Sequence, residues 1–221
     1  MDGNRRWAQR RSQLSTQGYL NGVKAMKRVI AYCIKKNIEY LSLYTFSLEN
    51  LKRTQEEKKY LFSVLPILLT NLADELRNQN VSVRFVGDRD FFPEEMMDFV
   101  LSMESKTAIC TGLKLQLLFC YGGQQEVLQA AKSLVEDVQK NGMTTENLTI
   151  EKFQDYFWTK GIPNPDVIIR TGGHKRLSNF LLFQAAYAHI YFLDILWPDM
   201  SEHEMDAVVL DVEKQVQNFG K

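Results

Sequence analysis

Short apolar runs that are typical of β-strands alternate along this chain with longer segments that have helical periodicity. The runs that predict strands are residues 38–46, 81–86, 113–121, 166–170 and 189–193. The segments that predict helices are residues 18–37, 54–80, 93–110, 124–140, 150–160 and 201–218. Strands separated by helices connect through right-handed crossovers and pair in parallel. The alternation therefore predicts an α/β fold, with a single domain over residues 1–221 and a mainly parallel central sheet flanked by helices.

The composition is that of an ordinary folded protein. Hydrophobic residues make up 45% of the chain, and 27 basic residues balance 27 acidic ones. Zero formal charge removes the usual electrostatic reason to expect nucleic-acid binding, and the hydrophobic content excludes disorder. No window reaches the roughly 18 apolar residues of a membrane span, and the opening residues are too polar for a secretory signal. With Cys33 and Cys120 in apolar segments that predict buried thiols, these features favour a cytoplasmic location.

The first residues form a basic patch. Arg5, Arg6, Arg10 and Arg11 lie within seven positions without an acid among them. Such a patch in a neutral chain indicates either a site for a small anion or a solvated helix face. Asp2 adds a carboxylate beside these groups, which is useful where Mg²⁺ bridges a carboxylate and a phosphate. A frayed terminus is the alternative interpretation of this segment.

The loop after the fourth predicted strand is the strongest candidate for an anion site. It contains Arg170, Gly172, Gly173, Arg176 and Ser178. Glycines let the backbone approach an anion, guanidinium groups match phosphate oxygens, and a hydroxyl adds a donor. Ligands of parallel α/β sheets bind beyond the carboxyl ends of the strands, where this loop is expected. The alternative is a glycine turn with incidental surface charge.

The segment after the first predicted strand lies at the same end of the sheet. There Asn50 and Arg53 would reach the strand-end crevice, although the residues alone favour helix capping around Thr54. Two apolar segments, residues 60–72 and 91–103, lie in predicted helices, and Pro66 should kink the first of these helices. They predict either a dense core or the walls of a hydrophobic tunnel for a hydrocarbon chain.

Several motifs together resemble those of the cis-prenyltransferase family. The matching stretches, in family order, are MDGNRRWA (1–8), YTFSLENLKR (44–53), FVGD (85–88), CYGG (120–123), PDVIIRTGGHKRLSNFLLFQAAYAHIYF (165–192) and LWPD (196–199). The resemblance implies a transferase that condenses isopentenyl diphosphate onto an allylic diphosphate, usually farnesyl diphosphate, with new cis double bonds. The implied product is a long polyprenyl diphosphate such as undecaprenyl diphosphate, a carrier lipid for cell-wall synthesis.

The resemblance also assigns roles to individual residues. Asp2 would hold Mg²⁺, the implied cofactor, and assist departure of the allylic diphosphate, and Asn50 would orient isopentenyl diphosphate and remove its proton. Arg170, Arg176 and Ser178 match positions that hold the diphosphate of isopentenyl diphosphate. The full set implied in substrate binding is Gly3, Asn4, Arg5, Arg6, Trp7, Tyr19, Ser47, Glu49, Arg53, Arg170, Arg176 and Ser178.

The sequence departs from the family pattern at several positions. His189 stands where the family often carries a glutamate that contributes to Mg²⁺ binding, and His174 replaces another common glutamate. We keep His189 as a candidate metal ligand beside Asp2, and expect weaker Mg²⁺ dependence or tolerance of Mn²⁺ or Co²⁺ because imidazole suits Mg²⁺ less well than oxygen. Tyr19 stands where bacterial members usually have histidine. The family's apolar strand before MDGN is missing, so we expect a start assigned too late or a truncated chain.

Two alternatives to a long-chain synthase remain. One is a non-catalytic partner subunit of a heteromeric prenyltransferase, against which the retention of Asp2, Asn4 and Arg6 argues. The other is an enzyme of the same fold with a shorter product, which the sequence hardly separates from a long-chain synthase. The resemblance further implies a homodimer and peripheral membrane contact during product release.

Overall fold

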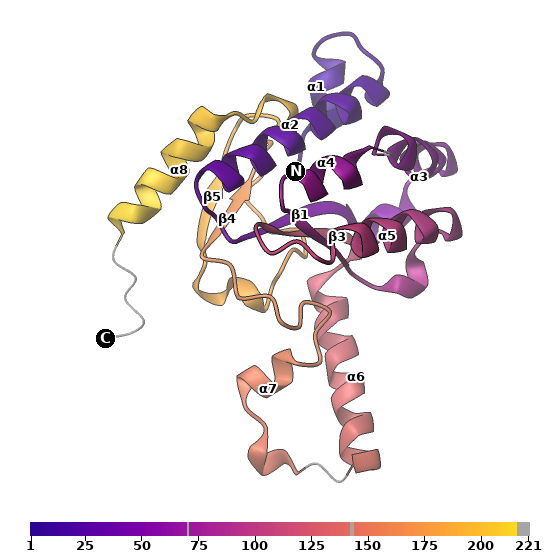
Figure 1. Cartoon of the computed structure of the whole chain (residues 1–221), viewed down its shortest axis with the longest axis vertical. Helices are drawn as coiled ribbons and strands as arrows, with labels where there is room; N and C mark the ends of the chain where they lie inside the picture. Colours follow the sequence, from indigo (N-terminus) through magenta and orange to yellow (C-terminus); the bar gives the residue numbers. More distant parts are fainter. Residues whose placement is uncertain (70, 142–143, 216–221) are drawn as a thin grey trace. The chain divides into compact units, whose positions relative to one another are not determined.

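The computed structural model describes residues 1–69, 71–141 and 144–215 (Figure 1). Contacts between residues divide the chain into two compact units. Unit 1 consists of Met1–Glu39, Asn164–Leu177 and Gln184–Lys221, and unit 2 consists of Tyr40–Pro163 and Ser178–Phe183. Each unit combines helices with parallel strands, which confirms the predicted α/β class. The single domain over residues 1–221 stays a prediction.

Unit 1 contains one pair of strands and three α-helices among its described residues. Its elements are α1 (Asn4–Gln9), α2 (Ser15–Lys35), β4 (Val167–Arg170), β5 (His189–Phe192) and α8 (Glu202–Lys214), with 3-10 helices at Gln184–Tyr187 and Trp197–Asp199. Strands β4 and β5 pair in parallel, with Val167 opposite His189 and Arg170 opposite Phe192. Helix α1 was missed by the sequence analysis, because six residues are too few to show a helical period.

Helix α2 is the helix on which the other two α-helices of unit 1 pack, within the described residues. It contacts α1, α8 and the 3-10 helix Trp197–Asp199. Gly18 and Gly22, one turn apart on α2, permit the close approach of α1. A Cβ atom at Gly18 would lie 2.1 Å from the backbone oxygen of Asn4, and one at Gly22 would lie 2.3 Å from the Asn4 side-chain oxygen. The backbone of the MDGN segment is therefore held directly against this helix.

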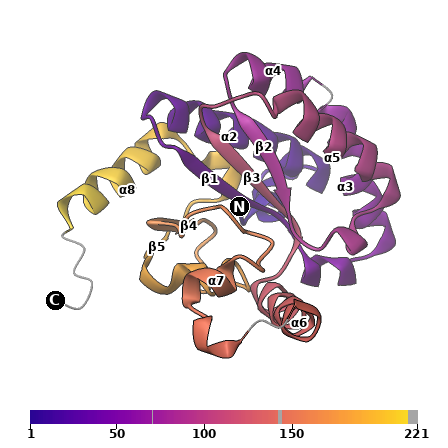
Figure 2. The same cartoon turned by 60° about the horizontal axis from the view of Figure 1, so that its bottom comes forward.

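Unit 2 contains a three-stranded parallel sheet in the order β1-β3-β2 (Figure 2). Its strands are β1 (Tyr40–Ser47), β2 (Ser82–Val86) and β3 (Lys114–Tyr121), and its α-helices are α3 (Gln55–Leu68), α4 (Leu72–Asn78), α5 (Glu94–Thr107), α6 (Gly123–Asn141) and α7 (Ile150–Gln154). Short 3-10 helices occur at Leu48–Lys52, Arg89–Phe91 and Thr145–Asn147. The central strand β3 is buried along most of its length. The parallel pairing that the sequence predicts is confirmed.

The long helix predicted over residues 54–80 is two helices, α3 and α4, so this prediction was wrong. Pro66 lies inside α3, where it has no amide hydrogen to donate and its ring crowds the preceding turn. Helix α3 ends at Leu68, and α4 begins at Leu72 after Asn71 as its N-cap. Residue 70 lies outside the described residues. The short helix predicted over residues 150–160 likewise ends earlier, at Gln154.

Helix α5 packs against β2, α3 and α4 within unit 2. Its apolar residues Met96, Val100 and Met103 are between 0% and 3% exposed, so they belong to the core of this unit. This burial agrees with the dense-core interpretation for the apolar segment at residues 91–103. The side chains of residues 64, 65, 67 and 68 of α3 lie outside the described set. The hydrophobic tunnel therefore stays a prediction.

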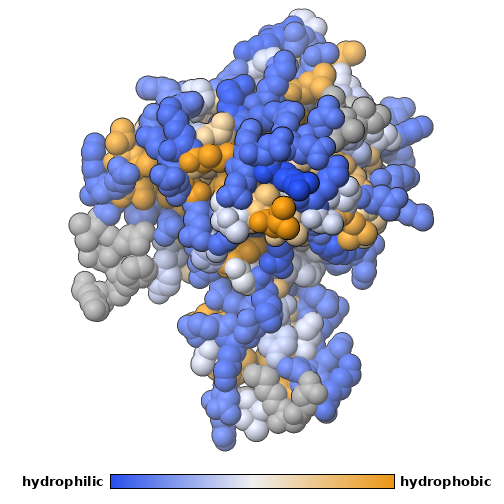
Figure 3. Space-filling model, viewed as in Figure 1, coloured by the Kyte–Doolittle hydropathy of each residue, from blue (hydrophilic) through white to orange (hydrophobic). Residues whose placement is uncertain are grey.

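The face of the molecule drawn in Figure 3 is mostly hydrophilic, with small hydrophobic areas between the polar residues. Within the described ranges, no helix is both long enough and apolar enough to cross a membrane. The predicted final helix, residues 201–218, is described as α8 only as far as Lys214, and residues 216–218 lie outside the described part of the chain.

Candidate active site

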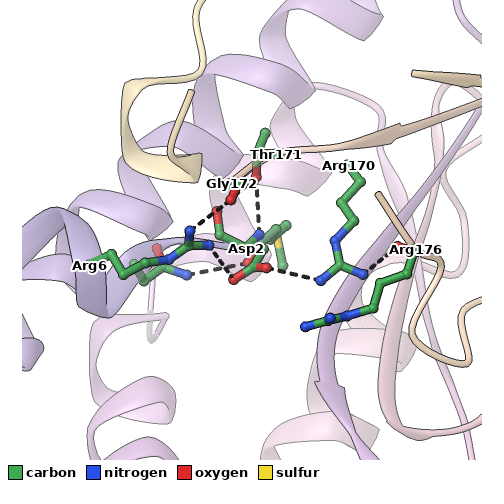
Figure 4. Close-up of polar contacts among 8 residues, drawn as sticks. Asp2, Arg6, Arg170, Thr171, Gly172 and Arg176 are labelled. Carbon is green, nitrogen blue, oxygen red and sulfur yellow. Dashed lines mark hydrogen bonds and ion pairs between the residues drawn. The ribbon is translucent and has the colours of Figure 1, made fainter. Parts of the chain in front are cut away.

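The carboxylate of Asp2 lies between two guanidinium groups in unit 1 (Figure 4). Arg170 donates from Nη2 to Asp2 Oδ2 at 3.0 Å, and Arg6 Nη2 lies 3.3 Å from Asp2 Oδ1. Arg170 comes from the carboxyl end of β4, whereas Arg6 comes from α1. The patch of arginines near the start of the chain and the RTGG loop, two separate predicted sites, thus meet around one acid.

Backbone contacts fix Asp2 at this point. The hydroxyl of Thr171 accepts from the Asp2 amide at 3.1 Å and donates to the Asp2 carbonyl oxygen at 2.9 Å. The amide of Trp197 donates to the same carbonyl oxygen at 3.0 Å. Thr171 is 2% exposed, so these bonds are shielded from water. The position of the carboxylate is therefore set by the residue that follows β4.

The glycine after Thr171 makes room for Arg6. Gly172 has φ +91°, a left-handed conformation that favours glycine, and its carbonyl oxygen accepts from Arg6 Nη1 at 2.7 Å. A Cβ atom at this position would lie 2.5 Å from Arg6 Nη2. The amides of Gly172 and Gly173 donate to the carbonyl oxygens of Ile195 and Leu193, at 2.6 and 2.9 Å, which tethers the loop to the chain after β5.

The charges of this group keep the Asp2 carboxylate ionised. Partial burial alone would raise its pKa, but the hydrogen bond from Arg170 and the positive charges of Arg6 and Arg170 outweigh that effect and lower the pKa below its usual value. Arg170 is only 14% exposed at its side chain, whereas Asp2 is 37% exposed. An anion that enters here meets a cationic site whose one acid stays charged at neutral pH.

Arg176 adds a third guanidinium to this region. The carbonyl oxygen of Arg176 accepts a hydrogen bond from Arg170 Nη1, and its side chain lies beside that of Arg170 with the guanidinium extended toward Asp2 (Figure 4). Because the two nitrogens of one guanidinium hold Asp2 and the loop at the same time, Arg170 couples the carboxylate to the segment that carries Arg176.

Other predicted residues of unit 1 lie around this cluster with different neighbours. Gly3 is the N-cap of α1 with φ +112°, Arg5 is exposed, and Asn4 packs on α2.

The indole nitrogen of Trp7 donates to Asp199 at 2.6 Å, and the guanidinium of Arg11 lies 4.1 Å from the Trp7 ring centroid. Trp7 is therefore engaged with the LWPD motif. Tyr19 is half-buried in α2.

His189 is not brought together with Asp2. It begins β5 opposite Val167, whereas Arg170 ends β4 opposite Phe192. Three residue steps along a parallel strand separate these ends by about 10 Å. His174 is exposed in the loop after β4. Its role and that of His189 in metal binding stay predictions.

The residues around Asp2 fit a metal that is shared with a phosphate ligand. Mg²⁺ in phosphate sites usually takes one or two carboxylates and completes its shell with phosphate oxygens and water. Asp2 offers one ionised, partly exposed carboxylate beside the cationic groups that a diphosphate requires. Among the described residues, no group of three or more His, Cys, Asp or Glu side chains is arranged to hold a metal ion.

A second group of predicted residues lies in unit 2, on the turn that follows β1. Ser47 and Asn50 form a capping box, in which each side chain bonds the backbone amide of the other. This box starts the 3-10 helix Leu48–Lys52, which carries Glu49, and Arg53 is its C-cap. Reciprocal hydrogen bonds between the two residues explain why a turn forms immediately after the strand, and they aim Asn50 back toward the strand end.

Ser178 belongs to unit 2, whereas Arg170 and Arg176 belong to unit 1. Ser178 is exposed and has φ +51°, and Asn179 beside it has φ +65°. The side chain of Asn179 donates to Glu49 at 2.7 Å, so Ser178 adjoins a residue that binds the turn after β1. Strained backbone at this position agrees with a functional segment, since such conformations cluster at binding sites.

Two residues that organise these two groups, Thr171 and Asn179, were not among the predicted site residues. Both lie in the loop from Arg170 to Asn179 that was predicted to bind an anion, so the signal was their place in the motif. Their individual bonds join segments far apart in the sequence, which no local pattern reveals.

Comparisons with known proteins give one consistent result. The model of the Prenyltransf family, described as "Putative undecaprenyl diphosphate synthase", matches residues 1–220. An isoprenyl transferase of Clostridium perfringens is 39% identical over 220 residues, which cover 100% of this chain and 87% of the relative. A ditrans,polycis-undecaprenyl-diphosphate synthase of Coxiella burnetii, (2E,6E)-farnesyl-diphosphate specific, is 37% identical over 220 residues, covering 100% of this chain and 93% of the relative.

Two solved structures extend this similarity to the fold. Lavandulyl diphosphate synthase from Lavandula x intermedia, in complex with dimethylallyl diphosphate, has a TM-score of 0.95 and 26% identity, with 100% of this chain and 95% of that chain covered. A probable undecaprenyl diphosphate synthase from Campylobacter jejuni has a TM-score of 0.80 and 31% identity, with 91% and 92% covered.

Proposed function

Because this chain belongs to the undecaprenyl diphosphate synthase family of cis-prenyltransferases, we propose that it elongates an allylic diphosphate with isopentenyl diphosphate units. The allylic starter is farnesyl diphosphate, each addition creates a cis double bond, and the product is a long polyprenyl diphosphate, undecaprenyl diphosphate. The single observation that supports this most strongly is the Asp2 carboxylate held between the guanidinium groups of Arg6 and Arg170.

We assign the allylic diphosphate to this cationic group. When the carbon–oxygen bond of the allylic substrate breaks, negative charge develops on the diphosphate that leaves. Fixed guanidinium groups stabilise that charge more strongly in the transition state than in the ground state, which is the condition for catalysis. Arg6 already donates to Gly172, so its guanidinium is fixed before the substrate arrives. We also assign Gly3, Asn4 and Arg5 to the binding of the allylic diphosphate.

Mg²⁺ would be held by Asp2 together with diphosphate oxygens, and it would neutralise part of the leaving group's charge. The ionised state of Asp2 at neutral pH suits this role. We keep His189 as a proposed metal ligand at a position separate from Asp2. His189 begins β5, whereas Arg170, which binds Asp2, ends β4 at the other end of the strand pair.

The isopentenyl diphosphate half of the proposal uses Arg170, Arg176 and Ser178 for the diphosphate. The turn after β1 supplies Asn50, which orients the substrate and takes part in removing its proton, with Ser47, Glu49 and Arg53 around it. The capping box supports this assignment, because it holds the Asn50 side chain in one orientation. New carbon–carbon bond formation then releases one proton from isopentenyl diphosphate and one diphosphate from the allylic partner.

The hydrocarbon product requires an apolar container. Each buried methylene stabilises binding by about 0.8 kcal/mol, so we propose that the apolar helices of unit 2 enclose the growing chain. A homodimer, a cytoplasmic location and peripheral membrane contact during product release belong to the same proposal, and nucleic acid has no part in it.

Radiolabelled isopentenyl diphosphate tests the function directly. The purified chain is incubated with this substrate, farnesyl diphosphate and Mg²⁺, and the products are separated by chromatography after dephosphorylation. We expect a ladder that ends near eleven isoprene units. Absence of any elongation would overturn the proposal in favour of the non-catalytic partner subunit, and a product of only a few units would identify a short-chain synthase. Replacing farnesyl diphosphate by dimethylallyl diphosphate, which the Lavandula structure contains, tests the starter length.

A further inference from the structure

Asn179 bonds two separate elements of unit 2 with one side chain. Its Oδ1 accepts from the Gln124 amide at 2.8 Å, and its Nδ2 donates to Glu49 Oε1 at 2.7 Å and to Gln125 Oε1 at 2.9 Å. An asparagine amide has two hydrogens to donate and one oxygen to accept with. All of these groups are used here, which defines the orientation of the amide.

One side of this arrangement is a helix cap. The amides of Gly123 and Gln124 open α6, where they have no acceptor within the helix. The backbone oxygen of Asn179 accepts from Gly123 at 2.8 Å, and its side-chain oxygen accepts from Gln124. A residue from a distant loop thus caps the helix, as an N-cap asparagine does from within its own helix.

Glycines make this approach possible. A Cβ atom at Gly122 would lie 2.3 Å from Gln125 Oε1 and 2.8 Å from Asn179 Nδ2, and one at Gly123 would lie 3.2 Å from the Asn179 carbonyl oxygen. The next residues anchor the segment in the core, because Phe180 stacks on Tyr44 at 5.0 Å between ring centroids. The segment that contains Ser178 therefore has little freedom to move.

The other side of the arrangement is the turn after β1. Glu49 lies one residue before Asn50, inside the 3-10 helix that the capping box starts. Partial burial opposes ionisation of Glu49, but hydrogen bonds from its own amide, Asn179 and Ser47, together with the charge of Lys52, lower its pKa. The Asn179 amide is thus one of the groups that keep this carboxylate charged and in place.

We propose that Asn179 is a positioning residue that fixes the Glu49 carboxylate, and through it the Asn50 turn, relative to Ser178. This inference rests on the proposed function, since Ser178, Glu49 and Asn50 are its isopentenyl diphosphate group. A purely structural cap would need only the acceptor oxygen. The two donated hydrogen bonds serve the arrangement of Glu49 and Gln125, and one of them reaches a side chain 130 positions earlier in the chain.

The variant Asn179→Asp separates the capping of α6 from the positioning of Glu49. Aspartate is isosteric and keeps the acceptor for the Gln124 amide, with a negative charge that suits the start of a helix. It replaces the donor Nδ2 by an oxygen that faces Glu49 and Gln125. We expect a folded variant whose kcat/KM for isopentenyl diphosphate falls on the order of 10- to 100-fold, because misplacement by about 1 Å costs up to that much. The KM for farnesyl diphosphate should change little.

A double variant tests whether Glu49 is the residue through which Asn179 acts. In Asn179→Asp/Glu49→Gln the polarity of the bond is reversed, because the glutamine amide donates to the new carboxylate. We expect the double variant to lose less activity than the product of the losses in Asn179→Asp and Glu49→Gln. Strictly multiplicative losses would overturn positioning through Glu49, and unchanged kinetics of Asn179→Asp would overturn the inference altogether.

The pH dependence gives a second test. In Asn179→Asp, a proton shared at low pH between Glu49 and the carboxylate introduced beside it would restore a hydrogen bond, since two adjacent carboxylates raise each other's pKa. The defect of this variant relative to the wild type should therefore shrink as pH falls from about 8.5 to 6. Among the described residues, Lys52 and Tyr44 interact electrostatically with Glu49, and both are unchanged in the variant. A defect independent of pH would contradict the proposal.

Asn71→Asp is the matched control. Asn71 is the N-cap of α4, is exposed, and has no capping hydrogen bond from its side chain. It should retain wild-type kinetics. If Asn179→Asp does not fold, Asn179→Gly decides instead, because glycine accepts φ +65° and keeps the backbone acceptor, and wild-type kinetics in it would overturn the inference. An inactive wild type would contradict the proposed function itself, a result distinct from any of these.

Discussion

The Asp2 carboxylate accepts a hydrogen bond at 3.0 Å from Arg170, a residue 168 positions further along the chain. This bond, with the Arg6 guanidinium on the other carboxylate oxygen, joins the start of the chain to the carboxyl end of β4. We propose that this acid between two arginines binds a diphosphate with its metal, and the first predictions concern this group.

Asp2→Ala should reduce turnover by at least about 100-fold, the loss typical of removing one charge-stabilising group from an active site. The fold should persist with a lowered melting temperature, because the mostly buried Arg170 guanidinium loses this acid and each 1 kcal/mol lost shifts the melting temperature by about 2–4 °C in a chain of this size. Thermal unfolding and the elongation assay together check this. Asp74→Ala, at an exposed ion pair with Lys106, is the control and should stay active. Retained turnover in Asp2→Ala would remove the role assigned to Asp2.

Arg170→Lys should lose about tenfold or more in kcat/KM although the charge is kept. Two nitrogens of the Arg170 guanidinium bond different partners, Asp2 and the carbonyl oxygen of Arg176. A lysine ammonium is a single point and cannot reproduce this planar fork. Steady-state kinetics with each diphosphate varied in turn will measure the loss. Equal kinetics of wild type and variant would show that charge alone matters here.

Gly172→Ala should lower both stability and activity. A left-handed conformation costs a non-glycine residue roughly 1–2 kcal/mol, and the new Cβ atom would lie 2.5 Å from Arg6 Nη2. Gly161→Ala is a close control, since Gly161 has φ +77° and an added Cβ atom there would meet nothing within 4 Å. We expect the control to lose stability only. Equal activities of the two variants would show that Arg6 adapts without cost.

The three thiols should differ sharply in reactivity. Burial raises the pKa of the Cys33 and Cys120 thiols to about 12, so at pH 8 only on the order of one molecule in 10,000 carries a thiolate at either position. Cys110 is only partly buried. Iodoacetamide should add one group to the native protein, at Cys110, and three to the unfolded protein, as read by mass spectrometry. Early modification of Cys120 would contradict the buried environment described for it.

Acid should weaken the Asp2 group in a defined direction. Its pKa is lowered in the folded chain from 3.8, so its contribution to stability is complete above that value and is lost as pH falls through the lower folded pKa. The difference in urea midpoint between wild type and Asp2→Asn should shrink as pH falls below about 4. A difference that grew on acidification would mean that the carboxylate is not stabilised as an ion.

Local sequence patterns predicted the secondary structure well where the pattern was long. The five strands and most helices lie where periodicity placed them, and both groups of strands pair in parallel. At Pro66 the sequence predicts a kink in one long helix, whereas the helix ends at Leu68 and a second one begins at Leu72. Helix α1 was missed because its six residues contain no complete repeat.

The sequence by itself determined the chemistry that this protein has available. The motifs identified the family, and the position of Arg170 after a strand indicated an anion site. What only the tertiary structure decided is which groups meet: Asp2 with Arg170, Asn179 with Glu49, and His189 apart from Asp2. The reason is physical. Helices and strands depend on neighbours a few residues apart, whereas a hydrogen bond between distant residues depends on the path of the whole chain, to within a few tenths of an ångström.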